Sequence, residues 1–531
     1  MSLIRIQDLT FRYDTGYETI FDHVSFQIDT DWKLGFIGRN GRGKTTFLNL
    51  LLGKYEYSGT ISGTVTFDYF PFEVEDSGAN TLAVMKNAIA PYQLWEKQME
   101  ELLTQNTEQA LLKYSDIQEQ FMNHDGYIID ELIEKEIGKL NVGTDVLTRP
   151  FQTLSNGERT KLLLAVLFLK QNNFLLIDEP TNHLDAEGRK TVADYLKNKK
   201  GFILVSHDRD FLDAVIDHVL SINRCDIEVQ KGNFSSWQEN KDRKDAFELA
   251  ENEKLKKDIR HLETAAKRTC EWADTVEHSK IGFDPAKTEK NIARRSIMGE
   301  KSRKMMQRSK NIERRQQSAI EEKSGLLKNV EQAEALKINL LIPPKEQVAE
   351  IRSLSIFYGE KTLFDDVSFT VNRGDRVALQ GKNGCGKSSI LKLLMGEEIP
   401  HTGTCKTAGQ IIASYIPQDT SFLHGSLKEF AETEKIDESL FKAILRKLDF
   451  SRAQFEKDIS EFSGGQKKKV LLAKSLSQEA HLYVWDEPLN FIDVLSRMQI
   501  EDLILAYCPT MIFVEHDSMF RRKIATKTVT F

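Results

Sequence analysis

At 531 residues the chain exceeds what a single hydrophobic core supports, so at least two domains are expected. A composition of 40% hydrophobic and 29% charged residues excludes disordered and fibrous classes. The sequence contains no apolar run of about 18 residues, the length that a membrane-spanning helix needs, so no membrane span is expected. The net charge of −7 is uneven, since residues 241–330 hold 23 Lys/Arg against 16 Asp/Glu. The chain starts in a strand pattern without an apolar leader, and its five scattered cysteines lack disulfide or zinc spacing, so a reducing cytoplasm is expected.

An internal repeat divides the chain into two copies. FDHVSFQI…KLGFIGRNGRGKTT (21–46) is echoed by FDDVSFTV…RVALQGKNGCGKSS (364–389). Further on, LSNGERTK is echoed by FSGGQKKK, LLIDEPTNHLD by YVWDEPLNFID, and SHD by EHD. Ser155 to Asp178 and Ser463 to Asp486 are both 23 positions apart. We therefore predict two domains of one α/β fold, over residues 1–238 and 346–531.

Each copy opens with a phosphate loop. GRNGRGKT (38–45) and GKNGCGKS (381–388) match G-x-x-x-x-G-K-[ST], and each lies between an apolar strand and an apolar helical run. Backbone N–H groups of such a loop bind phosphate oxygens, the lysine reaches the terminal phosphates, and the Ser/Thr can ligate Mg²⁺. The alternative is a glycine-rich turn. The predicted ATP-binding residues are Gly38, Arg39, Asn40, Gly41, Arg42, Gly43, Lys44, Thr45 and Thr46, with Gly381, Lys382, Asn383, Gly384, Cys385, Gly386, Lys387, Ser388 and Ser389.

Each copy has one tyrosine before its phosphate loop, and the first copy alone carries an insertion. Tyr13 and Tyr358 precede the loops and could stack on adenine, although aromatic residues there are as often core. Lys44 to Ser155 is 111 positions whereas Lys387 to Ser463 is 76, so the first copy holds about 35 extra residues. Apolar residues at three-to-four spacing predict an amphipathic helical arm within 84–135.

The glycine motifs that follow predict a contribution to the ATP site of the facing copy. A hydroxyl and a backbone nest at a helix N-terminus suit a γ-phosphate. These residues are Ser155, Asn156, Gly157 and Glu158 in the first copy and Ser463, Gly464, Gly465 and Gln466 in the second. Two composite sites result, each with the phosphate loop of one copy and this signature loop of the other.

Paired acids end a buried strand in each copy, in FLLIDE and LYVWDE. Asp178 and Asp486 suit the Mg²⁺ shell, and Glu179 and Glu487 are placed to orient or deprotonate the attacking water. The alternative is that these acids cap a helix. His207 and His516 could sense the γ-phosphate, an interpretation that depends on their repeated context. Gln418 ends YIPQ in the second copy, where the first copy has Phe72 in YFPF.

Between the copies, residues 239–345 predict a long helical hairpin with its tip at about 278–297, closed by Pro343-Pro344. Its segment 301–315 holds seven basic residues and one acidic residue. Such a cluster suits RNA phosphates. The alternative is an ordinary solvated helical face.

Together these motifs resemble the ATP-binding cassette superfamily, in order in both halves. Two cassettes joined by a charged helical linker, without a membrane domain, resemble the ABC-F family of ribosome-associated ATPases. Finer features resemble its Lsa-type antibiotic-resistance branch: DWKLGFIGRNGRGKTT, KGNFSSW, KDAFELAENEK and AKSLSQEAHLYVWDEPLNFID. Asn156 departs from the family by replacing a signature glycine, and Phe491 stands where the first copy has His183. The resemblance also implies that Gln418 offers an amide to ATP and the metal, which Phe72 cannot. These departures put equal turnover at the two sites in doubt.

The resemblance implies a monomeric, cytoplasmic ATP hydrolase that needs Mg²⁺ and has no membrane partner. In its ATP form the hairpin would enter the exit-tRNA site of a bacterial ribosome, beside ribosomal RNA and the P-site tRNA. Lincosamide, pleuromutilin and streptogramin A antibiotics would then be displaced. The expected ribosome-contacting residues are Ile281, Phe283, Arg294, Arg295, Arg303, Lys304 and Arg308.

Three other functions remain open from the sequence. A housekeeping ABC-F translation factor would share every motif above but confer no drug protection. The ATPase subunit of a transporter would need a separate membrane partner and gives the hairpin no role. A DNA-repair or chromosome-organising ATPase would be expected to carry zinc cysteines or a much longer coiled coil.

Overall fold

The computed structural model describes residues 2–531 except 14–18, 75, 106, 171–172, 183, 224–225, 282–302, 305–306, 308–309, 313, 316–335, 359–360 and 383. The chain divides into unit 1, Met1–Trp237 with Ala333–Phe531, and unit 2, Gln238–Gln332. We call residues 1–238 the first copy and residues 346–531 the second copy. The domain boundaries predicted from the sequence stay predictions.

The first copy is a β-rich phosphate-loop half followed by a helical half. Its strands are β1 (Leu3–Arg12), β2 (Thr19–Asp29), β3 (Lys33–Ile37), β4 (Ser58–Ser62), β5 (Thr66–Phe70), β6 (Asn173–Asp178), β7 (Phe202–Val205), β8 (His218–Asn223) and β9 (Asp226–Lys231). Its helices are α1 (Lys44–Leu51), α2 (Thr81–Ile89), α3 (Tyr92–Leu103), α4 (Glu108–Asn123), α5 (Ile129–Lys139), α6 (Asn156–Leu169), α7 (Ala186–Lys197) and α8 (Arg209–Val215), with 3₁₀ turns η1 (Thr144–Thr148) and η2 (Phe151–Thr153).

The second copy repeats this order. Its strands are β10 (Gln347–Tyr358), β11 (Lys361–Asn372), β12 (Arg376–Gln380), β13 (His401–Thr407), β14 (Ala413–Ile416), β15 (Leu482–Asp486), β16 (Met511–Val514) and β17 (Lys527–Thr530). Its helices are α11 (Lys387–Leu394), α12 (Leu427–Thr433), α13 (Glu438–Lys447), α14 (Gly464–Ser477), α15 (Val494–Tyr507) and α16 (Ser518–Ile524), with η3 (Arg452–Glu456) and η4 (Ile459–Glu461). The 48-residue helix α9 (Phe234–Ile281) follows the first copy.

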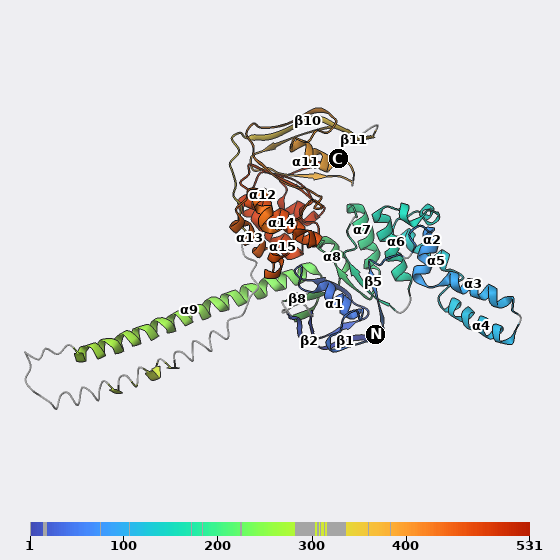
Figure 1. The fold of residues 1–531 in the computed structure, drawn as a ribbon, viewed down its shortest axis with the longest axis horizontal. Coiled ribbons are helices and arrows are strands. Elements are labelled where there is room, and N and C mark those ends of the chain that lie inside the picture. Colours follow the sequence, from blue (N-terminus) through green and yellow to red (C-terminus); the bar gives the residue numbers. More distant parts are fainter. Residues whose placement is uncertain are drawn as a thin grey trace, which may run out of the picture. The chain divides into compact units, whose positions relative to one another are not determined.

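Each copy combines a small antiparallel sheet with a larger, mainly parallel sheet (Figure 1). The strand orders are β2-β1-β4 and β5-β6-β7-β3-β8-β9 in the first copy, and β11-β10-β13 and β14-β15-β16-β12-β17 in the second. The run β6-β7-β3-β8 matches β15-β16-β12-β17, so the two copies share one α/β topology. The carboxyl ends of neighbouring parallel strands meet at one edge, where ligands of α/β proteins bind.

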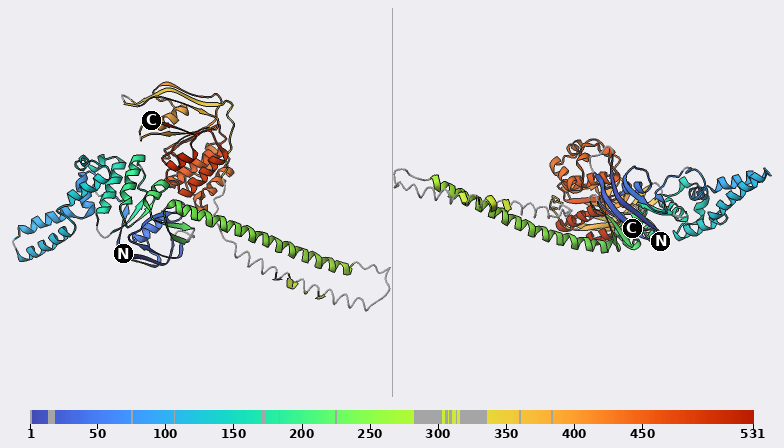
Figure 2. Two further views of the ribbon diagram at one scale, coloured as in Figure 1. Left: turned by 180° about the vertical axis from the view of Figure 1, so that it is seen from behind. Right: turned by 90° about the horizontal axis from the view of Figure 1, so that it is seen from below.

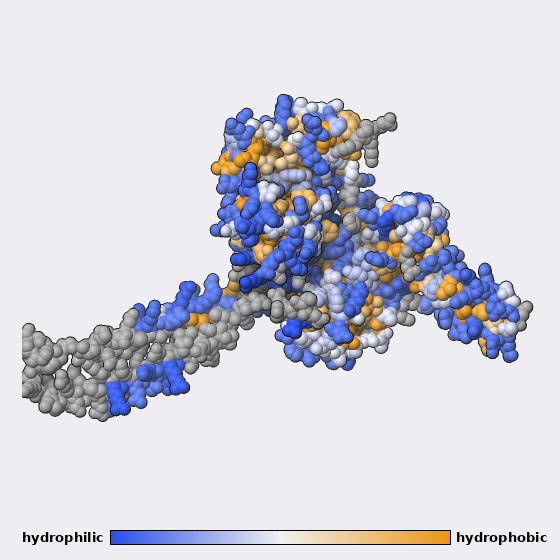
Figure 3. Space-filling view, viewed as in Figure 1, coloured by the Kyte–Doolittle hydropathy of each residue, from blue (hydrophilic) through white to orange (hydrophobic). Residues whose placement is uncertain are grey.

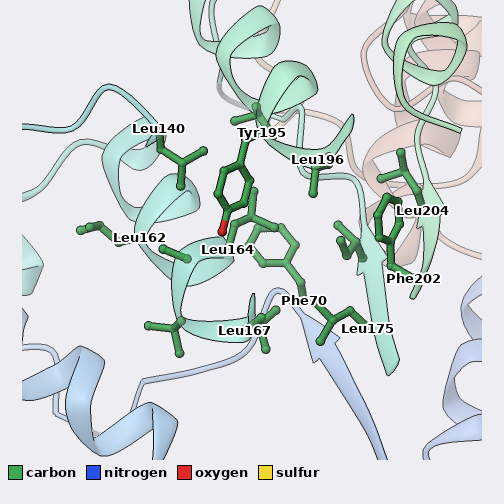
Figure 4. Packing of buried hydrophobic residues seen from close by; sticks show 14 of the residues in the cluster. Phe70, Leu140, Leu162, Leu164, Leu167, Leu175, Tyr195, Leu196, Phe202 and Leu204 are labelled. Carbon is green, nitrogen blue, oxygen red and sulfur yellow. The ribbon is translucent and has the colours of Figure 1, made fainter. Parts of the chain in front are cut away.

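Apolar strands are buried on both faces of the parallel sheets. In β6 the four residues Phe174–Ile177 are buried, and all five residues of β15 are buried. Such continuous apolar runs are typical of parallel strands, which are covered on both sides. Figure 4 shows the packing beside β6, where Leu164 of α6 lies with Phe70 and Tyr195. These strands thereby hold the acids at their carboxyl ends in fixed positions.

Helices α2 to α5 cover the range predicted for the arm of the first copy. Within it α3 and α4 lie side by side as a helical pair, as both Figure 1 and Figure 2 show. The ring of Trp95 on α3 packs edge-on against Phe121 of α4, with ring centroids 6.5 Å apart. The amphipathic pattern therefore corresponds to helices that pack on one another.

Replacing Leu164 by Ala tests the packing of this core. Leu164 is fully buried, so we expect a loss of about 2–5 kcal/mol of unfolding free energy, or at least about 4 °C in the Tm of the first copy. Leu94 on α3 is 53% exposed and serves as the matched control, since Leu94→Ala should shift the Tm by less than about 2 °C. Differential scanning calorimetry measures both. Equal Tm shifts would contradict the assigned core.

Candidate active site

The phosphate loop of the first copy lies between β3 and α1. Gly41 and Gly43 have φ of 86° and 92°, a left-handed conformation that glycine adopts without strain. At Gly43 a Cβ would also lie 2.5 Å from Ile20. The Lys44 Nζ donates hydrogen bonds to the carbonyl oxygens of Gly38 at 2.6 Å and Arg39 at 3.2 Å, and burial lowers the pKa of Lys44. A buried ammonium inside a glycine loop fits a phosphate group.

The loop of the second copy has the same form. Gly384 and Gly386 have φ of 76° and 98°. The Lys387 Nζ donates to the carbonyl oxygens of Gly381 and Lys382, both at 2.9 Å. Cys385 lies in this loop, while Asn383 lies outside the described residues. The chain therefore holds two phosphate loops of matching geometry.

Each strand-end aspartate lies beside the hydroxyl that follows the loop lysine. The Thr45 Oγ1 donates to Asp178 Oδ2 over 3.4 Å, and the Tyr69 hydroxyl donates to the same oxygen over 3.0 Å. In the second copy Ser388 hydrogen-bonds Asp486, whose pKa burial raises to about 6. One hydroxyl and one carboxylate at each site are hard oxygen donors of the kind Mg²⁺ prefers, with ATP phosphates completing the shell.

The next residue in each copy is a glutamate in a strained conformation. Glu179 and Glu487 have φ of 51° and 49°, which is uncommon for a residue with a side chain. Their amide N–H groups donate to the carbonyl oxygens of Val205 and Val514. Strain of this kind persists where surrounding structure enforces it and clusters at functional sites. Both carboxylates are thereby aimed beside the strand-end aspartates.

The surroundings of the two glutamates differ. Glu487 accepts hydrogen bonds from Gln418 at 2.8 Å and Asn490 at 2.6 Å, and its other oxygen lies 3.0 Å from His516 Nε2. Although burial acts to raise it, the contacts with His516 and Gln418 lower the pKa of Glu487 to about 2. The second-copy glutamate is therefore held as an anion.

Glu179 lacks the amide that Gln418 supplies. Phe72 occupies the corresponding position and packs against the core. The Glu179 Oε1 lies 3.3 Å from His207 Nε2 without a hydrogen-bond partner, and burial together with Asp178 raises the pKa of Glu179 to about 8. Burial, with Lys44 and Arg497, lowers the pKa of His207 well below its usual value. The doubt about equal turnover, raised from Phe72, thus has a structural basis.

Both signature loops start a helix. Ser155 caps α6 in a capping box with Glu158, and Ser463 caps α14 in the same way with Gln466. A Cβ on Gly465 would lie 2.4 Å from the Phe491 carbonyl oxygen and 3.1 Å from Asn40 Nδ2, so glycine is required there. The N-termini of α6 and α14 leave backbone N–H groups free for an anion.

The second composite site is a cavity of about 1140 Å³. It is lined by the first-copy signature residues Ser155, Asn156, Gly157 and Glu158, and by Gly384, Gly386, Lys387, Ser388, Ser389, Gln418, Glu487 and His516 of the second copy. Asp185 and Asn490 also line this cavity, although they were not predicted from the sequence. They could have been predicted, because both lie within the repeated motifs that follow the paired acids.

At the first composite site the second copy contacts the phosphate loop directly. Asn40 donates from Nδ2 to the Phe491 carbonyl oxygen at 2.7 Å and from its backbone N–H to Asp493 at 3.3 Å. Arg42 lies 3.3 Å from Asp449. Asp493 was not predicted from the sequence, although it is the counterpart of Asp185. At this site the second copy therefore contributes Phe491, Asp493 and Asp449 to the surroundings of the loop.

The remaining predicted residues are placed as follows. The Tyr13 hydroxyl lies 2.7 Å from Thr46 Oγ1, and the ring of Tyr13 stacks edge-on against Phe11 and Tyr55. The side chains of Tyr358 and Ile281 lie outside the described residues. Phe283, Arg294, Arg295 and Arg308 are outside them altogether, whereas Arg303 and Lys304 are helical and exposed.

In the part of the chain that the structure describes, no helix is long and apolar enough to cross a membrane. Nor do three His, Cys, Asp or Glu side chains gather among these residues as a metal site.

Known proteins resemble the chain over nearly its whole length. The energy-dependent translational throttle protein EttA of Haemophilus influenzae is 26% identical, covering 96% of this chain and 89% of EttA. The ribosome protection protein VmlR of Bacillus subtilis is also 26% identical, covering 96% of this chain and 84% of VmlR. A crystal structure of archaeal ribosomal stalk protein aP1 with the ribosome recycling factor aABCE1 matches with a TM-score of 0.56 at 17% identity, over 98% of this chain and 87% of the matched chain.

A family model also matches each copy. The model described as ABC transporter covers residues 21–182 and 364–490, which together are more than half of the chain. Both matched segments contain a phosphate loop, a signature loop and the paired acids. The chain therefore belongs to the ABC transporter family, as an ATP hydrolase with two ABC ATPase domains in tandem.

Proposed function

We propose that this chain is an ABC-F ATPase that binds the bacterial ribosome in its ATP form and protects the peptidyl-transferase centre from antibiotics. It would occupy the exit-tRNA site, beside ribosomal RNA and the P-site tRNA, and displace lincosamide, pleuromutilin and streptogramin A drugs. The resemblance to VmlR, whose name is ribosome protection protein, supports this proposal. Residues 278–297, the predicted tip, would act on the drug site.

The main support for this function is the helix between the copies. With 48 residues, α9 is about 72 Å long at 1.5 Å per residue. The described part of unit 2 is hydrophilic along most of its length (Figure 3). Its residues Arg303, Lys304, Lys310, Arg314 and Arg315 are exposed cations on helical backbone. A long helix followed along the chain by exposed cations suits the phosphates of folded RNA.

ATP hydrolysis would proceed at both composite sites. Thr45 with Asp178, and Ser388 with Asp486, would hold Mg²⁺, which neutralises charge on the phosphates of ATP. Lys44 and Lys387 would exchange their hydrogen bonds to the loop carbonyls for the terminal phosphates. Glu179 and Glu487 would then orient or deprotonate the attacking water. The signature helix of the facing copy would contact the γ-phosphate, so ATP joins the two copies.

A second candidate function is a housekeeping ABC-F translation factor. The match to EttA, named a translational throttle protein, favours it with nearly the same coverage. It would use the same ATP sites and the same exposed cations. Only the effect on drug-bound ribosomes separates the two candidates.

The double variant Glu179→Gln, Glu487→Gln tests the link between ATP and ribosome binding. It removes both general bases while keeping side-chain shape, so we expect hydrolysis to fall by roughly 10²-fold or more. The ATP form should persist and cosediment with ribosomes more strongly than the wild type. Cosedimentation in ATP against ADP measures this. Near-wild-type hydrolysis would refute the catalytic assignment, and equal binding in both nucleotides would refute the ATP-dependent association.

Replacing Gln418 by Leu tests the difference between the two glutamates. The lost hydrogen bond to the Glu487 carboxylate should lower turnover of the second site roughly tenfold. We expect this loss in a Glu179→Gln background, where only Glu487 is active, and less than a twofold change in a Glu487→Gln background. Phe72→Leu is the matched control, with less than twofold effect in both. Equal effects of Gln418→Leu in both backgrounds would contradict the assignment.

Drug susceptibility tests the proposed function itself. Expression of the wild type should raise the inhibitory concentration of a lincosamide. Replacing Arg303, Lys304, Arg314 and Arg315 by Gln should abolish this protection and weaken ribosome cosedimentation, because fewer phosphates are neutralised. Purified variant should keep its basal ATPase rate. Wild-type expression without any change in susceptibility, with ribosome binding intact, would favour the housekeeping candidate.

A further inference from the structure

Three charged residues from the two copies are buried against one another. Arg209 of α8 is 5% exposed, and its partners Glu501 and Asp517 are 0% and 2% exposed. The Arg209 Nη1 donates to Glu501 Oε2 at 3.2 Å, its Nη2 donates to the other oxygen of Glu501, and Nη2 also lies 3.4 Å from Asp517 Oδ2. One guanidinium therefore joins two carboxylates of the facing copy in a bidentate contact, the geometry that arginine suits best.

These residues adjoin the histidines of both ATP sites. Arg209 follows His207 by two positions, and Asp517 directly follows His516. His207 lies beside Glu179, and His516 lies beside Glu487. A shift of either histidine segment therefore moves one side of the Arg209 contact.

Glu501 also belongs to a charged row on α15. Asp493, Arg497 and Glu501 are spaced four residues apart and so lie along one side of the helix. Asp493 accepts a hydrogen bond from the first-copy loop residue Asn40, and Arg497 lies 3.2 Å from Asp517. The N-cap residue Asp493 thereby contacts the first-copy phosphate loop, while Arg497 contacts Asp517 of the second copy and Glu501 contacts Arg209 of the first.

The equivalent positions of the repeat do not carry the residues that this contact needs, an arginine in one copy and a glutamate in the other. Arg189 pairs with Asp208 at 3.1 Å in the first copy, as Arg497 pairs with Asp517 in the second. Ala193, however, occupies the position of Glu501, and Ser518 occupies that of Arg209. A further contact between the copies joins Ser518 and Arg522 to Asp210, with Arg522 at 2.8 Å, and the Arg522–Asp210 pair is solvent-exposed. Exposed pairs couple weakly, whereas separating a buried pair leaves an uncompensated charge.

We propose that Arg209 is a positioning residue that, through Glu501 and Asp517, makes the first ATP site wait for the second. While the second site has not hydrolysed its ATP, the His516 segment holds Asp517 in place, and the Arg209 guanidinium keeps the His207 segment from returning to its starting position. Once the second site has hydrolysed its ATP, both histidine segments can move. This inference rests on ATP hydrolysis at two sites and not on the ribosomal function.

The double variant Arg209→Ser, Glu501→Ala tests the inference. It installs the residue types that the chain itself uses at the mirror position, Ser518 and Ala193, and leaves Asp517 paired with Arg497. No carboxylate or guanidinium of this contact is then buried alone, so the variant should fold. Circular dichroism melting and binding of a fluorescent ATP analogue verify this before kinetics.

The decisive readout is the factor by which Glu487→Gln lowers steady-state hydrolysis in two versions of the chain. With Arg209 and Glu501 intact we expect at least a fivefold loss, because the stalled second site holds the first. With Arg209→Ser, Glu501→Ala we expect about a twofold loss, because the first site cycles alone. A merely structural contact would change the rate of both chains without changing this factor.

The Arg522→Gln variant is the matched control, since it also removes an arginine that joins the copies. It should keep the fivefold factor. The inference is overturned if Glu487→Gln costs the same factor with and without the Arg209 contact, or if Arg209→Ser, Glu501→Ala abolishes hydrolysis altogether. Because ribosomes and drugs are absent from the assay, failure of the proposed ribosomal function leaves the outcome unchanged.

Discussion

Every property of this chain depends on the division of each ATP site between two copies of one fold. A phosphate loop holds its lysine against its own carbonyl oxygens, as Lys44 and Lys387 both do. The helix N-terminus that would complete the phosphate shell belongs to the facing copy, and Ser155 lines one cavity with Lys387. Neither copy can enclose ATP alone. In the proposed function, ATP would therefore bind residues of both copies at once, and this would let a nucleotide control a helix outside the catalytic domains.

The two copies keep the same types of residue at their ATP sites, but the contacts around these residues differ. Both glutamates share the same left-handed backbone, yet Glu487 is held by Gln418, Asn490 and His516 while Glu179 lacks the first of these. Likewise, one contact between the copies is a buried arginine with two carboxylates, and a neighbouring one is an exposed pair.

The sequence predicted the elements whose chemistry depends on local order. The loops, the paired acids and the α/β topology follow from spacing and apolar runs, because strand and loop geometry are set by adjacent residues. Arg209, Glu501 and Asp493 were not assigned roles, since their partners lie more than 290 positions away or across the copies. Pairing of that kind is set by tertiary packing. For Arg209 and Glu501, only the absence of matching residues at Ser518 and Ala193 could have drawn attention to them, whereas Asp493 repeats Asp185.

The inequality of the two ATP sites can be measured by rapid-quench detection of phosphate formation, in a single turnover of wild-type chain loaded with two ATP per molecule. We expect two phases of equal amplitude with distinct rate constants, one for each composite site. A single exponential that accounts for both phosphates would contradict it.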